Sequence, residues 1–308
     1  SLHDALPISR QLALRTKQSL AEPLGVSAAA IGQYESGATP PRAELIPRLA
    51  RELDVPREFF AAGRPLARLE TADAFFRSLR ATTAKQRAKA VSYTEQLWEL
   101  VHAVEKHVRL PPVNLPGFVG GEIEPGVFPN DPIAAARALR KAWGLGAEPI
   151  PHLVRTIENQ GIVAVLVPFA EDEVARIDAF STLSLSRPII VLSPDRANDI
   201  YRHRFTAAHE LGHLVMHGEL AGGDPALERE ADRFAAEFLT PSLVIQDLLP
   251  RRIDFRKLNQ LSEQWGVSIK SLIYRSREVG LLSDATARRA YIQLNQLSEQ
   301  GVIATQPV

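Results

Sequence analysis

Residues 204–217 read RFTAAHELGHLVMH, and this stretch decides what the surrounding segment folds into. The sequence predicts a buried helix, because apolar residues cover the faces that do not carry the two motif histidines. His209 and His213 are four residues apart, so they lie on one face of that helix, about 6 Å apart along its axis. Two imidazoles placed in this way can bind a single Zn²⁺, each at a bond length of about 2.1 Å.

Glu210 follows the first of these histidines directly, and we expect its carboxylate to face the open coordination position. There it can accept a proton from the attacking water and deliver that proton to a leaving amine. The pattern H-E-x-x-H arises by chance in roughly one chain in a hundred of this length. The apolar flanks of the motif make chance a weaker explanation here, because they predict the buried helix that a metal site requires.

A third metal ligand must come from histidine or a carboxylate, because the chain contains no cysteine. His217 lies eight residues beyond His209, about 12 Å along the helix axis. One straight helix cannot bring both of these residues and His213 to the same zinc ion. We therefore expect His217 either to interact with a metal ligand without binding the metal itself, or to be structural.

The next segment, residues 228–241, reads EREADRFAAEFLTP and predicts a second helix with an apolar face. Glu228 and Asp232 lie one turn apart on the edge of that face. We expect Glu228 to be the third ligand and Asp232 to orient a ligand histidine through its second ring nitrogen. Glu230 is rotated by about 200° from Glu228 and is expected to face solvent. The alternative for Glu228 is a solvated acid at a helix terminus, which the helix dipole would favour.

These two stretches strongly resemble the ImmA/IrrE family of metallopeptidases, and so does IDAFSTLSLSRPIIVLS at residues 177–193. The similarity extends over about residues 130–280. The resemblance implies a zincin-like α+β domain with a Zn²⁺ cofactor. It also implies that His209, His213 and Glu228 hold the metal and that Glu210 is the catalytic residue.

Residues 16–37 read TKQSLAEPLGVSAAAIGQYESG and predict two short helices, with Gly25 in the turn and Ser27 capping the second helix. The stretch resembles the Xre/Cro-type helix-turn-helix, an all-α module whose second helix lies in the major groove of DNA. The resemblance implies DNA contacts from Gln18, Ser27, Ala28, Ala29 and Gln33.

Two features of this module leave a second interpretation open. Gln33 is the one strong hydrogen-bonding group on the predicted reading face. Residues 10–60 contain seven Lys and Arg against six Asp and Glu, which is a small excess for binding phosphates. A helical packing or dimerisation module is therefore the alternative to a DNA reader.

Composition and pattern predict a multidomain chain of five segments. Residues 1–9 begin without Met and show no clear period, so we interpret them as candidate non-native sequence and leave them out of the fold. The other predicted segments are the helix-turn-helix domain at 10–65, a helical connector with a proline-rich linker at 66–132, the metallopeptidase domain at 133–282, and a C-terminal tail at 283–308.

Inside the metallopeptidase segment, the predicted order of helix, short sheet and further helices is typical of an α+β domain. Core strands are predicted at 162–167 and 188–192, and an edge strand at 180–185. The heptapeptide LNQLSEQ occurs at 258–264 and again at 294–300, and we interpret the two copies as similar amphipathic helix segments.

The linker is placed at 111–132, because its six prolines and four glycines sustain neither a helix nor a central strand. Residues 71–110 are expected to form one or two amphipathic helices. Their apolar side would consist of Phe75, Phe76, Leu79, Leu97, Leu100, Val101 and Val104. This stripe offers a surface for a homodimer, although packing within the chain would bury it equally well.

The bulk composition limits the classes of partner. The formal net charge is zero, so no global field attracts nucleic acid or membrane, and DNA binding must come from residues 10–65. No stretch reaches the roughly 18 apolar residues of a membrane helix. The absence of cysteine fits a cytoplasmic protein.

Two functions compete on this evidence. The first is a zinc-dependent, site-specific endopeptidase that regulates transcription by cleaving a protein partner such as a repressor. The second is a DNA-binding regulator whose metal domain senses a ligand without proteolysis. The complete H-E-x-x-H favours the endopeptidase, since a pure sensor does not need Glu210. A degenerate scaffold is disfavoured because every catalytic position is filled.

Overall fold

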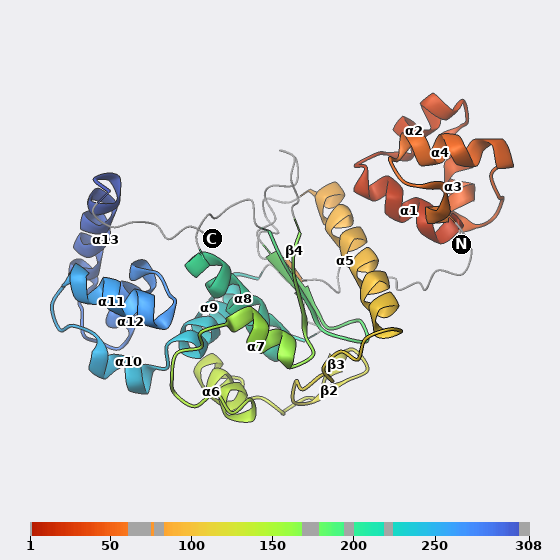
Figure 1. The fold of residues 1–308 in the computed structure, drawn as a ribbon. Helices are drawn as coiled ribbons and strands as arrows, with labels where there is room; N and C mark the ends of the chain where they lie inside the picture. The colour runs from red at the N-terminus through yellow and green to blue at the C-terminus, as the bar shows by residue number, and fades with distance from the viewer. Residues whose placement is uncertain are drawn as a thin grey trace. The chain divides into compact units, whose positions relative to one another are not determined.

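A computed structural model describes residues 2–60, 75–76, 83–167, 179–193, 200–218 and 224–301. The described chain falls into two compact units, one all-α and one α+β, as the sequence predicts (Figure 1). The first unit extends to Leu110, except that the short strand Phe75–Phe76 belongs to the second. None of the helices in these stretches is long and apolar enough to cross a membrane.

The first unit contains a five-helix arrangement with two single turns of 3₁₀ helix. Its elements are α1 (Leu2–Leu12), α2 (Lys17–Leu24), α3 (Ala28–Ser36), η1 (Ala43–Leu45), α4 (Ile46–Glu52), η2 (Arg57–Phe60) and α5 (Ala84–Glu105). Thr16 begins α2 with a capping box, and Gly25 ends it at φ 68°, in the left-handed region that glycine tolerates best. The Oγ of Ser27 accepts a hydrogen bond from the amide of Ala30 at 3.1 Å, as expected for an N-cap.

The exclusion of residues 1–9 from the fold is wrong, because α1 begins at Leu2 and buries Ala5 and Leu6 in the core of the first unit. The helical period is hard to recognise because Ser9 occupies a buried position. Its hydroxyl donates to the carbonyl oxygens of Ala5 and Leu6 at 3.0 and 3.1 Å, so burying it does not leave the hydroxyl unpaired.

The apolar stripe expected on residues 71–110 also differs from the structure. Phe75–Phe76 form strand β1 rather than helix. In α5 the buried residues lie towards the start of the helix, whereas Leu100 is 61% exposed. This start of α5 packs on α1, where the hydroxyl of Ser92 donates to the side-chain oxygen of Gln11 at 2.5 Å. Of the expected stripe, Leu79 lies outside the described residues.

The sheet of the second unit has the strand order β1–β5–β6–β4, from β5 (Ala179–Thr182), β6 (Ile189–Leu192) and β4 (Val163–Leu166). β4 runs parallel to β6, and the other neighbours are antiparallel. The predicted positions of two strands are therefore wrong. The strand expected at an edge, β5, is internal, and the strand expected in the core, β4, lies at an edge. All four residues of β5 are buried, although its sequence AFST is half polar.

Eight helices accompany this sheet in the described part of the second unit. They are α6 (Pro132–Ala142), α7 (Leu153–Asn159), α8 (Ile200–Met216), α9 (Pro225–Leu239), α10 (Ser242–Leu248), α11 (Phe255–Trp265), α12 (Ile269–Glu278) and α13 (Asp284–Glu299). α8 contacts both the buried strand β5 and the helix α9, so it lies in the core (Figure 1). Residues 284–299, expected in a tail, are a regular helix that buries Ala287 and Ala290.

Residues 111–132 pack against the second unit instead of forming a separate linker. They contain the hairpin β2 (Phe118–Val119) and β3 (Glu122–Ile123), and Leu115 is buried in the main core. A Cβ at Gly161 would lie 2.4 Å from the carbonyl oxygen of Pro112, so only glycine allows this approach. The prolines and glycines here shape an extended chain that lies on the domain.

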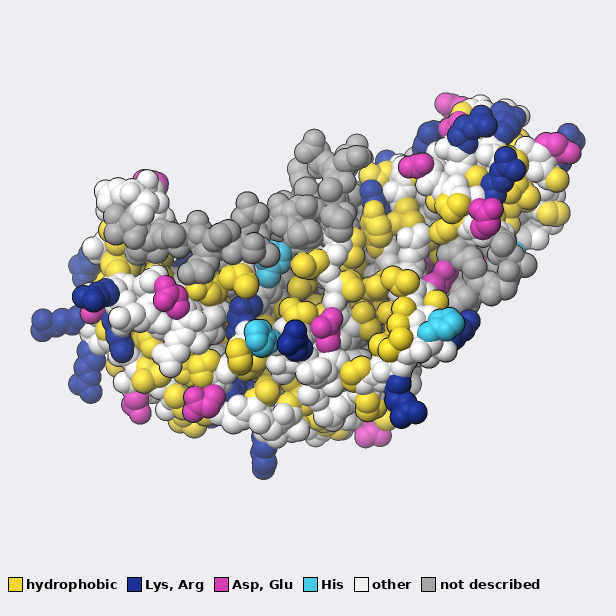
Figure 2. Space-filling model, viewed as in Figure 1, with side chains coloured by type: hydrophobic (Ala, Val, Ile, Leu, Met, Phe, Trp, Pro, Cys, Tyr) yellow, Lys and Arg dark blue, Asp and Glu magenta, His cyan; other side chains and the backbone are white. Residues whose placement is uncertain are grey.

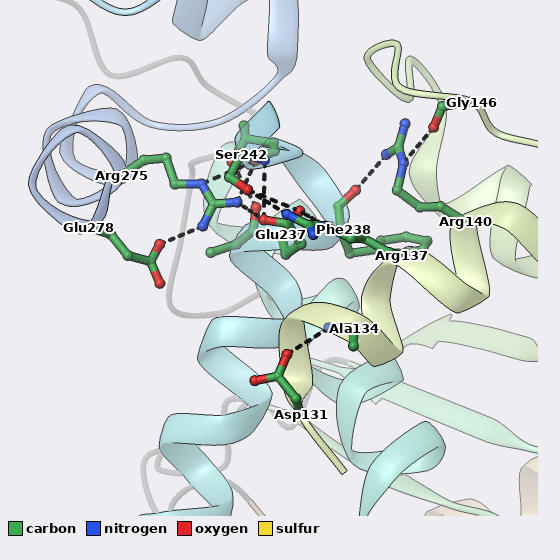
Figure 3. Close-up of polar contacts among 12 residues, drawn as sticks. Asp131, Ala134, Arg137, Arg140, Gly146, Glu237, Phe238, Ser242, Arg275 and Glu278 are labelled. Carbon is green, nitrogen blue, oxygen red and sulfur yellow. Dashed lines mark hydrogen bonds and ion pairs between the residues drawn. The ribbon is translucent and has the colours of Figure 1, made fainter. Parts of the chain in front are cut away.

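α9 is fixed to three neighbouring helices through the buried carboxylate of Glu237 (Figure 3). Arg137 of α6 donates to it at 2.8 Å, and the guanidinium of Arg275 on α12 donates to its other oxygen. Ser242 of α10 donates through both its backbone amide and its hydroxyl. These bonds satisfy a charge that would be costly to bury alone.

Charged groups of both signs are mixed on the face of the molecule seen in Figure 2, including the visible face of the first unit. This mixture agrees with the formal net charge of zero. Recognition of a charged partner therefore has to come from local groups of side chains.

Candidate metal centre

The helices α8 and α9 bring His209, His213 and Glu228 together. One ligand atom from each of the three lies within 4.8 Å of the others. The Nε2 atoms of the two histidines are 3.0 Å apart, and the Glu228 carboxylate oxygens lie 3.4 Å from Nε2 of His209 and 3.5 Å from Nε2 of His213. Three groups predicted from spacing alone therefore converge on one point, where they could hold a metal ion.

The packing of the two helices explains how they come so close. A Cβ at Gly212, inside the motif, would lie 3.0 Å from the ring of Phe234 on α9. Phe234 is fully buried and stacks on Phe238, so it has little room to move. Glycine at this position lets the helix backbones approach, and the approach brings Glu228 to the histidines.

The donor set is two imidazoles and one carboxylate, which suits a borderline-soft divalent ion and leaves one coordination position open. Burial raises the pKa of Glu228, but the adjacent His209 and His213 outweigh that effect and bring the pKa down to about 2. The carboxylate is therefore ionised at neutral pH. Both histidine side chains are almost completely buried, which keeps their ring nitrogens away from bulk water.

Each of the two histidines makes a hydrogen bond through Nδ1, the ring nitrogen that faces away from the other ligands. Nδ1 of His209 lies 2.8 Å from Oδ1 of Asp232. Because an ionised carboxylate only accepts, this Nδ1 carries the proton, and Nε2 is left with its lone pair for a metal. Asp232 thus lies against the second ring nitrogen of a candidate ligand histidine.

A longer chain of hydrogen bonds orients His213. Its Nδ1 lies 2.8 Å from Nδ1 of His217, and Nε2 of His217 lies 3.2 Å from a carboxylate oxygen of Glu230. Burial and the nearby His213 lower the pKa of His217 to about 4, so His217 is neutral. A neutral His217 that donates to Glu230 must accept from His213, which leaves Nε2 of His213 free to face the metal position. Glu230 therefore faces solvent only in part, because its side chain is 42% exposed and its carboxylate also contacts His217.

Glu210 lies next to this cluster but outside it, fully buried. The hydroxyl of Ser181 on β5 lies 2.8 Å from a carboxylate oxygen of Glu210 and 3.3 Å from its backbone carbonyl oxygen. Since both of these atoms accept, Ser181 is the donor. Sequence reasoning missed Ser181, and the available signal was a polar pair, serine and threonine, inside a strand that is buried throughout.

Of the predicted DNA-contacting residues, Gln18 lies on α2, and the other four lie at the start of α3 or on it. Gln18, Ser27, Ala29 and Gln33 are exposed, and Ala28 is half-buried. Gln18 donates to Glu22 at 3.2 Å, and the hydroxyl of Ser27 is used as the cap of α3. Gln33 therefore stays the best candidate for reading a base edge.

Residues 157–277 match the model of the peptidase M78 family, described as an IrrE N-terminal-like domain. The chain carries an IrrE N-terminal-like domain. Residues 9–60 match a helix-turn-helix model, so both resemblances seen in the sequence are confirmed. A comparison with curated proteins found no match. The IrrE N-terminal-like match begins within α7 and ends within α12; it includes all residues of the metal cluster and leaves α13 outside.

Proposed function

We propose that the IrrE N-terminal-like domain is a zinc-dependent, site-specific endopeptidase that cleaves a protein partner. The observation that carries the proposal is the buried carboxylate of Glu210, which accepts from Ser181 and belongs to the residue that follows the candidate ligand His209. A domain that only binds a metal has no use for a further carboxylate that is buried, hydrogen-bonded and outside the ligand set. A peptidase needs such a group to move protons.

The residues of the chain would divide the work as follows. His209, His213 and Glu228 would hold the ion, which when bound supplies a Lewis acid that polarises the scissile carbonyl and acidifies water. Glu210 would accept the proton of the attacking water and then give it to the amine nitrogen as the peptide bond breaks. Asp232 and the His217–Glu230 pair would keep the two imidazoles in the tautomer that binds metal.

The helix-turn-helix domain would direct this activity to a regulatory site on DNA. Cleavage of a bound partner such as a repressor would then change transcription, in the cytoplasm. Because one reading face recognises few bases, a homodimer on two half-sites about one helical turn apart would supply the specificity. The arrangement also supports a second candidate, a regulator that responds to a ligand through its metal domain without cleavage, because one chain joins both domains.

The decisive comparison is between the wild type and Glu210→Gln on the proteins of the source cell. Mass spectrometry of new protein N-termini should find a small set produced by the zinc-loaded wild type. Glu210→Gln keeps the shape of the side chain but cannot carry the proton, so it should lose this cleavage by orders of magnitude while the fold is retained. A chelator should have the same effect on the wild type.

If Glu210→Gln produces the same new N-termini as the wild type, Glu210 is not the proton carrier. If neither protein cleaves anything and both regulate transcription equally in cells, the ligand-responsive regulator replaces the endopeptidase.

A further inference from the structure

A cavity of about 690 Å³ lies in the second unit, among α8, α9, α11, α12 and α13. This volume is within the range of about 300–1,000 Å³ that is typical of small-molecule sites. Asp232 lines the cavity, whereas His209, His213 and Glu228 do not. The cavity therefore adjoins the metal centre at Asp232, the residue that is hydrogen-bonded to Nδ1 of His209.

Asp232 connects the cavity with the ligand histidine His209, because it lines the cavity and contacts that ring. The Nε2 of His209 faces the other ligand atoms, and its Nδ1, on the opposite part of the ring, faces Asp232. A molecule in the cavity would contact Asp232, and none of the three ligand residues lines the cavity. We therefore treat the cavity as separate from the site where a substrate would be cut.

The repeated heptapeptide LNQLSEQ lines this cavity from both of its copies. Asn259 and Ser262 come from the copy on α11, and Asn295 and Ser298 occupy the same two positions of the copy on α13. Asparagine and serine three residues apart lie on the same face of a helix. The repeat therefore places matching amide and hydroxyl groups on two walls of one cavity, and α13 lies outside the matched family domain.

The rest of the lining includes apolar, aromatic and hydroxyl side chains and two cationic ones, Arg202 and Lys270. Phe205, Leu239 and Ile269 contribute apolar surface, and Tyr274 and Tyr291 contribute rings. Lys270 lies in the first turn of α12, exposed and with no ion pair in the described part of the chain. Residues 255–299 contain seven Lys and Arg against four Asp and Glu, so an anion is favoured around this cavity.

The walls of the cavity are tied together without any ligand. Thr240 at the end of α9 lines the cavity, and its carbonyl oxygen accepts from Arg275 of α12 at 2.8 and 3.1 Å. Arg275 also forms an ion pair with Glu237 on α9 (Figure 3). This clamp holds α9 and α12 at a fixed separation, so the cavity is formed in advance of binding.

We propose that this cavity binds a small amphipathic organic anion and that its occupancy strengthens metal binding through Asp232. The side chain of Asp232 is 49% exposed, so a bound molecule would replace the water on its outer side. A carboxylate with less water around it interacts more strongly with the Nδ1–H of His209, and this raises the basicity of the Nε2 that faces the metal. The coupling, though not the cavity, rests on the metal site proposed above.

Fluorescence titration of the full-length protein with 8-anilinonaphthalene-1-sulfonate tests the binding site directly, since this probe joins aromatic rings to an anion. One probe should bind per chain. Asn295→Trp should weaken binding about tenfold by filling the cavity, and Gln296→Trp, its exposed neighbour outside the lining, should not. Lys270→Glu should weaken binding by a similar factor, with Lys257→Glu as the matched control. The uncharged analogue N-phenyl-1-naphthylamine should bind more weakly than the anion.

Coupling is measured by repeating the titration on zinc-loaded and metal-free protein, with near-UV circular dichroism to verify that both are folded. The probe should bind the loaded protein at least about fivefold more tightly, and by reciprocity it should raise zinc affinity by the same factor. Asp232→Ala should remove the difference. Equal binding by Asn295→Trp and Gln296→Trp would overturn the site, and equal or weaker probe affinity in the loaded protein would overturn the coupling. Neither result depends on whether the protein cleaves a substrate.

Discussion

His209 and His213 each have one ring nitrogen in the ligand cluster and the other in a fixed hydrogen bond. For His209 the partner is a carboxylate, and for His213 it is a neutral His217 that a carboxylate holds in turn. Both arrangements leave the Nε2 lone pair facing the metal position. The direct carboxylate contact has the stronger effect on basicity, because an ionised acceptor polarises the imidazole more than a neutral ring does.

We therefore predict that Asp232→Ala lowers zinc affinity by about 10–100-fold without loss of the fold. Competition with a chromophoric chelator measures the affinity, and circular dichroism reports the fold. Asp247→Ala, which removes an exposed acid on α10, is the control and should leave zinc affinity unchanged. An unchanged affinity in Asp232→Ala would show that this contact does not tune the site.

The spacing along single helices was enough to nominate His209, His213, Glu228 and Asp232, and the structure brings these four side chains together. Ser181 could not be predicted in this way, since it comes from a strand 29 residues before Glu210 and meets it only in the folded domain. The contact of Glu230 was missed for a related reason. Its rotation away from Glu228 on α9 was correct, but His217 at the end of α8 extends to that side.

At the scale of elements, the errors have one common cause, which is polar or irregular sequence that the fold nevertheless buries. β5 was placed at an edge because AFST is half polar, yet its serine is buried against Glu210. Residues 111–132 were interpreted as a linker because of their prolines, yet they lie on the domain. The long, strongly periodic helices α8 and α9 were predicted on the segments that form them, and the first LNQLSEQ copy lies on a helix, α11, as predicted.

The clamp around Glu237 leads to a prediction about stability. Glu237→Gln keeps the volume of the side chain but removes the buried one of the two carboxylates that pair with Arg275, so the free energy of unfolding should fall by about 3 kcal/mol. Chemical denaturation followed by circular dichroism measures this change. Glu158→Gln, at an exposed position on α7, is the control and should change stability by less than about 0.5 kcal/mol. Equal stability of the two variants would mean that the clamp contributes little to the fold.

At the scale of the whole molecule, the chain joins a module that resembles DNA readers to a domain that resembles metallopeptidases. The helix-turn-helix carries small residues on its expected reading face, so most of its affinity for DNA should come from phosphates. Ion pairs of Arg10 and Lys17 with Glu35 reduce the positive charge that this unit can offer to phosphates. We therefore expect a single copy to discriminate poorly between sequences.

This view predicts that the logarithm of the DNA-binding constant falls linearly with the logarithm of the salt concentration. It also predicts that Gln33→Ala reduces the difference in affinity between a selected sequence and random DNA. The free energy by which the protein discriminates the contacted base pair from others should fall by about 1–3 kcal/mol. Fluorescence anisotropy with a sequence selected from random duplexes measures both effects, and Gln260→Ala on α11 is the control. If the wild type binds no DNA at low salt, residues 10–65 are a protein-interaction module instead.

The central claim is that His209, His213 and Glu228 hold a zinc ion while Glu210 stays outside its coordination. Elemental analysis of the purified protein after zinc reconstitution tests this claim most directly. The wild type and Glu210→Gln should each retain about one zinc per chain, and His213→Ala and Glu228→Ala should retain well below about half of that. A wild type that retains no zinc, or a Glu210→Gln variant that loses it, would contradict the account.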